Sequence, residues 1–304
     1  MSFKHNGVVI TLANYLEVFG DLEPDILDEI RSAILDDTPI SGFIKYCEDD
    51  SYKLGQLRLA VREYLPKEFI NPRLSGRCIY LLRQLYRNGY NLSILEKYIP
   101  KRGAPTIENE NLEVVLRAAL HGADIKKVDF NIVPTENINI ICEGLVKRYP
   151  MWLCVSPDRT LSNSIIRQLM KGMQLQIDIH PFLNGDWSEN QIVTILSNAT
   201  KINVNELLEN INSKFSMEQI MEVIYVARNK LDYALLCLKE SDGTPAFNQY
   251  QMSVIGKCLE DDILTEEIYD PQLSDMEMED LRIAELDKRK AEGNRKLGGT
   301  LRKR

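Results

Sequence analysis

The sequence lacks several features that would place it directly in a class of proteins. It has no apolar run of the length, about 18 residues, that a membrane-spanning helix needs, so no membrane partner is expected. Residues 1–12 show neither the apolar length nor the cleavage pattern of a secretory signal, and we expect a cytoplasmic protein. Only 3 histidines are present, and none of the 6 cysteines forms a C-x-x-C pair, which favours buried free thiols over a metal site.

The motifs of common enzyme classes are also missing. There is no phosphate-binding glycine loop, no dinucleotide fingerprint, no H-E-x-x-H and no nucleophile elbow. Asp178 and His180 place two titratable groups close together, as do Asp158 and Arg159, but no third group completes a catalytic set. We therefore expect no enzyme, no catalytic residue, no cofactor and no metal, while a site assembled from distant residues stays open.

What the sequence does contain is a unit of roughly 25 to 34 residues that recurs nine times. Each unit holds an Ile, Leu or Val anchor with a second apolar residue four positions later, and seven units add a third apolar residue three positions earlier. These positions lie on one face of an α-helix. The anchors are Ile30, Leu57, Leu82, Leu116, Ile141, Ile166, Ile195, Val223 and Ile255.

N-cap residues predict where these helices begin. In six units a good N-cap residue stands seven positions before the anchor: Asp50, Ser75, Asn109, Ser188, Ser216 and Asn248. After the last three of them a Gln follows three positions later, as in a capping box. The pattern predicts helices that start near residues 24, 51, 76, 110, 189, 217 and 249.

Each long helix is expected to end at an apolar-polar-apolar triplet. Gly89, Gly122 and Gly172 stand just before three triplets, where a left-handed C-cap favours glycine. A second, shorter helix is expected to follow, with caps at Ser93, Ser156 and Asn205. The triplets are Tyr90-Asn91-Leu92, Ala123-Asp124-Ile125, Met173-Gln174-Leu175, Ile202-Asn203-Val204 and Leu231-Asp232-Tyr233.

One such helix pair cannot bury its apolar stripe alone, whereas a stack of pairs can. We therefore predict an all-α fold, an α-solenoid-like helical repeat array of about nine helix–turn–short-helix units. Residues 1–22 are predicted to form an N-terminal cap, residues 23–270 the repeat domain, and residues 271–304 a charged C-terminal helix or tail. Exposed loops are expected at Pro100–Pro105 and Lys239–Pro245.

The segment Ile79–Leu92 resembles a known type of repeat. It is similar to the short Ile-Arg…Gly-Leu-Asp-Val helical repeats, about 25 residues long, of uncharacterised proteins from Gram-positive bacteria, their plasmids, conjugative elements and phages. Gln219–Val223 with Leu231-Asp232, and Gln251-Met252 with Ile255, resemble other parts of that unit. The resemblance covers about residues 24–264, and it implies a helical repeat fold without an established activity.

Charge is distributed unevenly along the chain, whose formal net charge is −8. Residues 260–287 carry twelve acidic side chains against Arg282 alone, and residues 288–304 carry eight basic ones against Glu292. The basic tail either contacts nucleic acid or balances the acidic stretch beside it, and both interpretations stay open. The candidate nucleic-acid residues are Lys288, Arg289, Lys290, Arg295, Lys296, Arg302, Lys303 and Arg304.

In five units an arginine follows the anchor. Arginine matches phosphate geometry well, but the acidic chain disfavours wrapping nucleic acid. We favour a structural stacking ladder in which each arginine bridges to an Asp or Asn of a triplet, such as Asn91 or Asp124. The arginines of this ladder are Arg31, Arg58, Arg83, Arg117 and Arg167.

Trp152 and Trp187 stand at predicted turns, where an aromatic residue either anchors a partner or caps the core. The leading hypothesis is a non-enzymatic scaffold or adaptor that binds a protein partner of unknown identity through helical repeats. The alternative is a nucleic-acid-associated accessory factor of a mobile element that uses the basic tail. A third hypothesis is a receptor for a peptide or small molecule.

Overall fold

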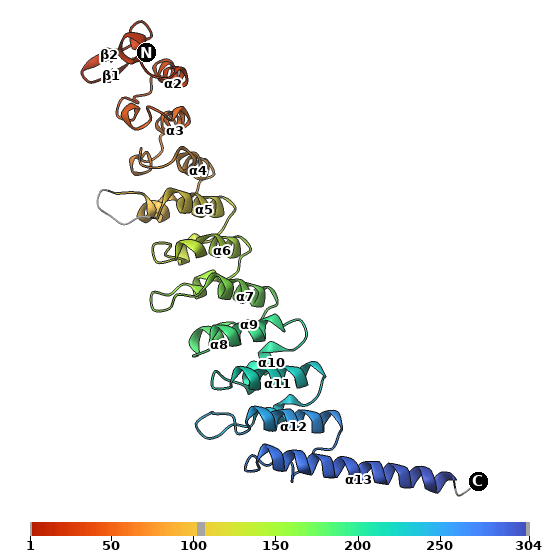
Figure 1. Ribbon diagram of the computed structural model, residues 1–304. Helices are drawn as coiled ribbons and strands as arrows, with labels where there is room; N and C mark the ends of the chain where they lie inside the picture. The colour runs from red at the N-terminus through yellow and green to blue at the C-terminus, as the bar shows by residue number, and fades with distance from the viewer. Residues whose placement is uncertain (1, 102–106, 302–304) are drawn as a thin grey trace. The chain divides into compact units, whose positions relative to one another are not determined.

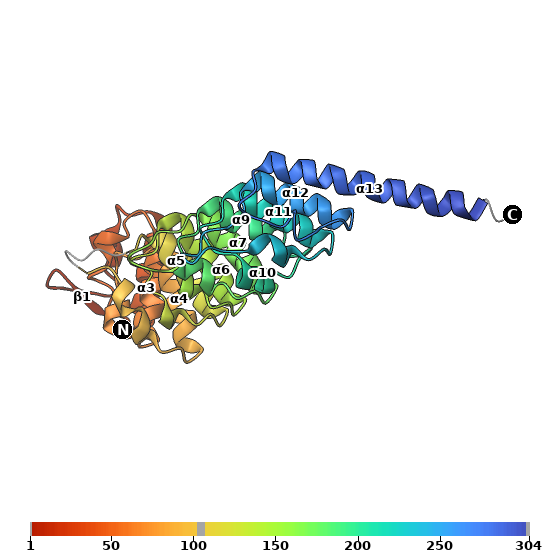
Figure 2. The same ribbon diagram turned by 90° about the horizontal axis from the view of Figure 1, so that it is seen from below.

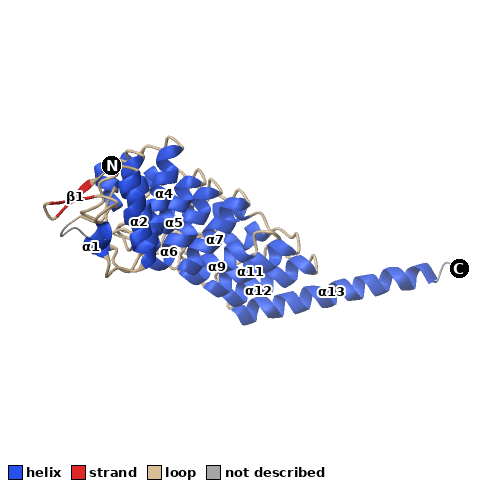
Figure 3. Cartoon of the chain, turned by 90° about the horizontal axis from the view of Figure 1, so that it is seen from above, coloured by secondary structure: helices blue, strands red, loops and turns tan. Residues whose placement is uncertain are grey.

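A computed structural model describes residues 2–101 and 107–301, with side chains described as far as residue 291. Most residues of the described chain lie in helices, and the two short strands are its only strands (Figures 1 and 3), which confirms the all-α prediction. It divides into two compact units, Met1–Ile166 and Arg167–Arg304, and the division falls inside helix α7 (Asn163–Gln174). The sequence analysis did not predict this division. The predicted loop at Pro100–Pro105 lies largely outside the described residues.

The first unit opens with an antiparallel hairpin that pairs Phe3 with Ile10, and a short helix follows it. Both strands lie within the predicted N-terminal cap and were not expected. The elements are β1 (Phe3–His5), β2 (Val8–Ile10), α1 (Tyr15–Phe19), α2 (Pro24–Leu35), α3 (Ser51–Arg62), α4 (Gly76–Arg87), α5 (Asn109–Leu120) and α6 (Thr135–Val146). From α2 to α6 each helix packs against the next, and 3-10 helices connect them: η1 (Ile44–Tyr46), η2 (Lys67–Phe69), η3 (Leu92–Tyr98), η4 (Ile125–Lys127) and η5 (Met151–Cys154).

The second unit continues this pattern from the end of α7. Helices α9, α11, α12 and α13 pack one against the next, and α13 runs well past the end of α12 (Figure 2). An isolated bridge between Lys239 and Pro245 closes the loop expected there. The elements are α8 (His180–Asn184), α9 (Glu189–Ser197), α10 (Val204–Asn210), α11 (Met217–Arg228), η6 (Tyr233–Cys237), α12 (Gln249–Glu260) and α13 (Asp275–Leu301).

The predicted helix starts agree with the structure to within one residue. The side chains of Asp50 and Ser75 accept backbone hydrogen bonds at the starts of α3 and α4, and capping boxes are formed at Ser188, Ser216 and Asn248. The exception is Asn109, which is the first residue of α5 rather than its cap, because Glu108 holds the cap conformation. Cap chemistry therefore positions most long helices.

Each of the eight helices of twelve residues in the described part of the chain ends in the same left-handed turn. The second residue beyond the helix has a φ of 53° to 84°, and the next residue donates a backbone hydrogen bond to the carbonyl five positions earlier, as Tyr90 does to Leu85 at 2.9 Å. Only Gly89 and Gly122 supply a glycine there. The other turn residues are Asp37, Tyr64, Arg148, Gln176, Lys230 and Asp262.

Two helices correct the register that the sequence analysis assigned. In most helices the anchor is the seventh residue, but Leu116 is the eighth residue of α5 and Ile166 the fourth of α7. The equivalent buried residues are Val115 and Leu169. Gly172, predicted as a C-cap, lies inside α7 and has no positive φ.

After four of the turns, the segment begins with an apolar residue that is buried or half-buried and a polar residue that closes a local turn. The side chains of Asn91, Asp124, Asp178 and Asp232 each accept a hydrogen bond from the backbone nitrogen two residues later. Short helices follow, as predicted after Asn91 and Asn203, although these two residues are the caps in place of Ser93 and Asn205. No helix begins at Ser156, because η5 precedes it.

Candidate functional surface

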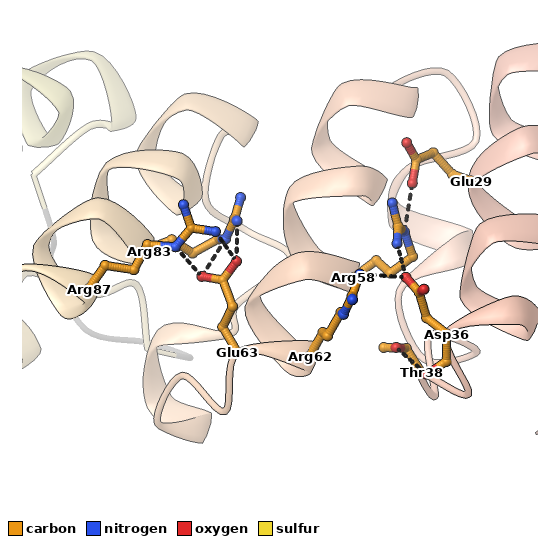
Figure 4. Close-up of polar contacts among 8 residues, drawn as sticks. All are labelled: Glu29, Asp36, Thr38, Arg58, Arg62, Glu63, Arg83 and Arg87. Atoms are coloured by element: carbon orange, nitrogen blue, oxygen red, sulfur yellow. Dashed lines mark hydrogen bonds and ion pairs between the residues drawn. The ribbon is translucent and has the colours of Figure 1, made fainter.

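In the first unit, arginines of one helix hold acidic residues at the end of the preceding helix (Figure 4). Asp36 is the C-cap of α2, where the helix dipole disfavours a negative charge. Arg58 of α3 hydrogen-bonds to Asp36 and, at 2.9 Å, to Glu29, while the more exposed Arg62 lies 3.3 Å from Asp36. Arg58 and Arg62 are one turn apart on α3, so the two guanidinium groups clamp one carboxylate.

The same arrangement recurs one helix later around Glu63, the C-cap of α3. Arg83 donates to both carboxylate oxygens of Glu63, with its Nε 3.2 Å from one of them, and Arg87 donates to the same group (Figure 4). Burial acts to raise the pKa of Glu63, but the hydrogen bonds from Arg83 and Arg87 outweigh it and hold that pKa below its usual 4.5. Arg83 is only 3% exposed, so Glu63 compensates a buried charge.

The other arginines of the predicted ladder do not share this geometry. Arg117 is the ninth residue of α5 and bonds to Glu113 in its own helix, Arg167 is the fifth residue of α7, and Arg31 is exposed on α2. Arg58 binds the helix-end carboxylate of Asp36 together with Glu29 inside α2, and Arg83 binds the helix-end carboxylate of Glu63 together with the side-chain amide of Gln56. For Arg58, Arg83 and Arg117 the prediction of a triplet partner, such as Asn91 or Asp124, was therefore wrong.

One arginine of this kind was missed by the sequence analysis. Arg282 is the eighth residue of α13 and lies 3.3 Å from Asp261, the C-cap of α12. The start of α13 carries the same signals as the earlier helices, since Ser274 and Glu277 exchange hydrogen bonds as in a capping box. That pair was the signal that could have identified a further helix in register.

In the second unit a neutral contact links the N-terminal ends of neighbouring helices. Gln191, Gln219 and Gln251 are the third residues of α9, α11 and α12, and the side-chain oxygen of each accepts from its own cap at 2.7 Å. Their amide nitrogens donate to the carbonyl that precedes the next cap, at Phe215, Phe247 and Leu273, over distances of 2.6 to 2.7 Å. Each glutamine thus fixes its own helix start and the spacing to the next helix.

The two tryptophans lie in different environments. Trp187 is only 6% exposed and packs edge-on against Phe182, with ring centroids 5.8 Å apart, so it caps the core and is not an exposed anchor. Trp152 is half-buried, and the Lys127 ammonium lies 4.0 Å from its ring centroid. Trp187 is therefore buried in the core, whereas Trp152 is partly exposed beside Lys127.

Large apolar side chains are instead exposed on the last three long helices. Met221 and Tyr225 lie on one face of α11, Tyr250 on α12, and Met276 on α13, with exposed fractions from 50% to 77%. Because α12 packs against both α11 and α13, these residues belong to three neighbouring helices. We call these four residues the Met/Tyr face. It was missed because the sequence analysis searched turns and charges rather than the outer face of each helix.

The predicted basic tail is described only in part. Lys288 lies 3.3 Å from Glu285, Arg289 lies 3.5 Å from Asp262, and Lys290 lies 3.9 Å from Asp287. The side chains of Arg295, Lys296, Arg302, Lys303 and Arg304 lie outside the described residues. The described basic residues therefore lie beside carboxylates of this chain.

The remaining titratable groups form no assembled catalytic set in the described parts of the chain. Asp178 and His180 lie 2.7 Å apart on the surface, and hydrogen bonds from His180 lower the pKa of Asp178. All six cysteines are free and buried, and burial raises the pKa of Cys142, Cys154 and Cys237 to about 12. Such thiols stay protonated at neutral pH and are poor nucleophiles. Among the described residues, no group of His, Cys, Asp and Glu could hold a metal ion.

An open cavity of about 550 Å³ lies beside the N-terminal hairpin, between α1 and η1. Its polar lining includes His5, Asp21, Lys45 and Glu48. The Nδ1 atom of His5 is buried without a hydrogen-bond partner, and its ring packs edge-on against Phe19. No pair of these groups is in hydrogen-bonding contact, so the cavity presents no defined acid–base pair.

None of the described helices is both long and apolar enough to cross a membrane. No family model, curated protein or solved structure matches the chain. The resemblance to the mobile-element repeats therefore stays a prediction.

Proposed function

We propose that the chain is a non-enzymatic, α-solenoid-like helical repeat protein that binds another protein through the outer faces of its helices. The Met/Tyr face is the observation that carries this proposal. Methionine and tyrosine are frequent at protein interfaces, because they provide large contact area, and methionine adapts its shape to different partners. Four such residues are exposed on three neighbouring helices.

The recurring twelve-residue helices, left-handed turns and capping contacts support a repeat architecture. In such an architecture the inner positions of each helix are fixed by stacking, while the outer positions vary without loss of the fold. The Met/Tyr face occupies outer positions of α11, α12 and α13. The same positions of α5 hold charged residues, among them Glu113 and Arg117, which bond to each other. The first unit also exposes a tyrosine at such a position, Tyr52 of α3 at 49%, but only α11, α12 and α13 expose Met or Tyr on three successive helices, and the second unit is therefore the proposed binding unit.

The nucleic-acid alternative has weaker support. Its described residues, Lys288, Arg289 and Lys290, each lie within 4 Å of a carboxylate, and the chain as a whole is acidic. A phosphate backbone would have to displace those carboxylates and approach a negative surface. We therefore favour a protein partner.

The test is an affinity capture from the native host after nuclease treatment, with three forms of the full chain. The first is the wild type, the second carries Met221→Ser, Tyr250→Ser and Met276→Ser, and the third carries Tyr64→Asn as a matched loss of an exposed tyrosine from the first unit. A protein that is captured by the first and third forms and lost from the second supports the proposal.

Two results would contradict the proposed function. Equal capture by all three forms would place binding away from the Met/Tyr face. Capture that disappears with nuclease, or on truncation before Lys288, would instead favour the nucleic-acid alternative. Circular dichroism of each variant, compared with the wild type, separates loss of binding from loss of folding.

A further inference from the structure

The outer side of α11, α12 and α13 can be identified from position along each helix. Successive residues turn by about 100°, so the second, fifth, sixth, ninth, twelfth and thirteenth residues, counted from the first helical residue, share one side. Met221 and Tyr225 are the fifth and ninth residues of α11, and Tyr250 and Met276 are the second residues of α12 and α13. Ile283, the ninth residue of α13, is 45% exposed on the same side. The fourth residues point to the opposite side and are buried: Ile220, Met252 and Met278. The Met/Tyr face therefore lies on one side of three helices that pack one against the next (Figure 1).

The same side of these helices carries an excess of carboxylates. At the six positions, seven acidic side chains stand against Arg228 and Lys257. Arg282 lies deeper and approaches Glu279 at 2.8 Å and Asp261 at 3.3 Å, so a net negative charge remains even when this arginine is counted. The seven acidic residues are Glu218, Glu222, Glu260, Asp261, Glu279, Asp280 and Asp287.

This excess is not a general property of the helices. On α4, α5 and α6 the same six positions hold four basic and four acidic side chains, so the charges balance. These residues are Arg77, Arg87, Arg117, Lys147, Glu110, Glu113, Glu136 and Glu143. A surface that combines exposed Met and Tyr with a net negative charge is complementary to a partner that is both apolar and basic.

Individual side chains of this surface are suited to a cationic group. Burial raises the pKa of Glu222 above its usual 4.5, although the nearby Lys257 acts to lower it, so the Glu222 carboxylate is poorly hydrated and gains from a further cation. A hydrogen bond to Glu260 of α12 raises the pKa of Tyr225 on α11 and links the two helices. The exposed faces of tyrosine rings also attract lysine and arginine side chains.

The extent of the surface favours a helical partner. Neighbouring helices pack roughly 8–10 Å apart, so a partner that covers all three spans about 20 Å. An α-helix of about 13 residues has that length. Along their length the three helices use their backbone groups internally, and they offer an extended peptide no backbone hydrogen bonds. A helix satisfies its own backbone groups and needs only side-chain contacts.

We infer that the Met/Tyr face binds a basic amphipathic helix of the partner protein, an inference that rests on the proposed function. Apolar side chains on one side of that helix cover the Met/Tyr face. Lysine or arginine residues beside them face Glu218, Glu222 and Asp280. The same carboxylates repel the phosphates of nucleic acid.

The test is selection from a displayed library of random peptides of about 20 residues, long enough for such a helix, on the purified full chain. Counter-selection on the variant with Met221→Ser, Tyr250→Ser and Met276→Ser keeps the peptides that need the Met/Tyr face. We expect these peptides to have a net charge of about +3 or more and apolar residues at intervals of three and four. Neutral, acidic or non-periodic peptides would overturn the inference and leave the proposed function standing, because they still need the face.

Binding of the retained peptides is then measured by fluorescence anisotropy with charge variants of the full chain. Glu218→Gln, Glu222→Gln and Asp280→Asn together should raise the dissociation constant about tenfold at low salt, and binding by the wild type should weaken as salt rises. The matched control carries Glu110→Gln, Glu136→Gln and Glu143→Gln on the outer side of α5 and α6, and it should bind like the wild type.

Equal binding by the two charge variants, or a selection that retains no peptide, would overturn the inference. Circular dichroism of each variant shows whether it is folded. The proposed function fails by a different result, namely equal capture of the partner protein by the wild type and the serine variant.

Discussion

The two units of the chain connect similar helices through different polar chemistry. In the first unit, guanidinium groups bind carboxylates at the C-terminal ends of α2 and α3, and the deepest of them, Arg83, is buried. In the second unit, glutamine amides bind carbonyls at the N-terminal ends of α9, α11 and α12. The apolar stripe of a helix fixes which face is buried, but it leaves open how far along its axis the next helix sits.

The polar contacts supply that missing specification. The arginine–carboxylate contacts and the glutamine–carbonyl contacts both fix the position of the neighbouring helix along its axis. Hydrogen bonds weaken steeply when donor and acceptor move apart or out of line. The two kinds of contact respond differently to pH and ionic strength, because only the arginine–carboxylate contact depends on protonation and is screened by salt. The links of the first unit should therefore follow pH and ionic strength, as should the Arg282–Asp261 pair of the second unit, whereas the three glutamine links should not.

The largest effect is expected from Arg83→Met, which preserves the aliphatic stem and leaves Glu63 paired only with the exposed Arg87. Breaking a buried pair from one side should destabilise the first unit by roughly 3 kcal/mol. Hydrogen exchange of peptides from α3 and α4, compared with peptides from α11 and α12, measures this loss. Arg87→Met is the matched control and should cost less than about 1 kcal/mol. Equal losses for the two variants would contradict the role of the buried clamp.

Gln251→Met should break the corresponding link in the second unit. The change leaves the carbonyl of Leu273 and the backbone nitrogen of Asn248 without their partner, at a cost of about 1–3 kcal/mol. Exchange should rise in α12 and at the start of α13, with the same amplitude at low and high salt. A salt-dependent loss would remove the distinction between the two kinds of link.

Acid should weaken the first unit through Glu63. Its pKa lies below its usual value in the folded chain, so Glu63 stabilises the fold above its unfolded pKa and this contribution is lost as pH falls through the folded pKa. Glu63→Gln should remove that part of the pH dependence while lowering stability at neutral pH. Urea unfolding between pH 7 and pH 3, monitored by exchange in α3 and α4, is the measurement. An unchanged acid response in Glu63→Gln would refute this assignment.

The smallest effect concerns a feature that the two units share. Tyr64 and Lys230 hold the left-handed turn in the first and second unit, and Tyr64 is 85% exposed. Glycine at either position relieves backbone strain but also frees the unfolded chain, so we expect a net gain of about 0.5–1 kcal/mol in both. Thermal unfolding of the two variants tests this. Different signs in the two units would show that the turns are not equivalent.

The comparison also shows what a sequence can specify. Helix starts were predictable because caps such as Ser75 and Ser188 act on their own first turn, a local effect. The predicted register of α7 was wrong because Gly172 matched the residue type expected at the turn. The actual turn residue is Gln176, and backbone hydrogen bonds hold the turn there. The triplet Ile177-Asp178-Ile179 was the better signal, since it follows the turn directly.

The candidate surface was less predictable than the fold. The carboxylates that bind Arg58 and Arg83 lie at the end of the preceding helix, far from these arginines in sequence. Which carboxylate each arginine binds therefore depends on how the helices stack. Burial of Trp187 depends on Phe182 in the same way, because only the folded loop brings the two rings together. The Met/Tyr face arises from single residues on separate helices, and no local pattern marks it.

The left-handed turns have a consequence for the length of the chain. Backbone hydrogen bonds define each turn, and the turn position holds Gly, Asp, Tyr, Arg, Gln or Lys, so each of the eight twelve-residue helices in the described part of the chain carries its own stop signal. Phe215 and Phe247 both precede a cap and both offer their carbonyl to the glutamine of the helix before. Deletion of residues 216–247 would join Phe215 to Asn248. The side chain of Gln191 would then still face a carbonyl that directly precedes an N-cap residue, now Asn248. We expect such a deletion to remove one helical unit and to leave the contacts of the new junction intact.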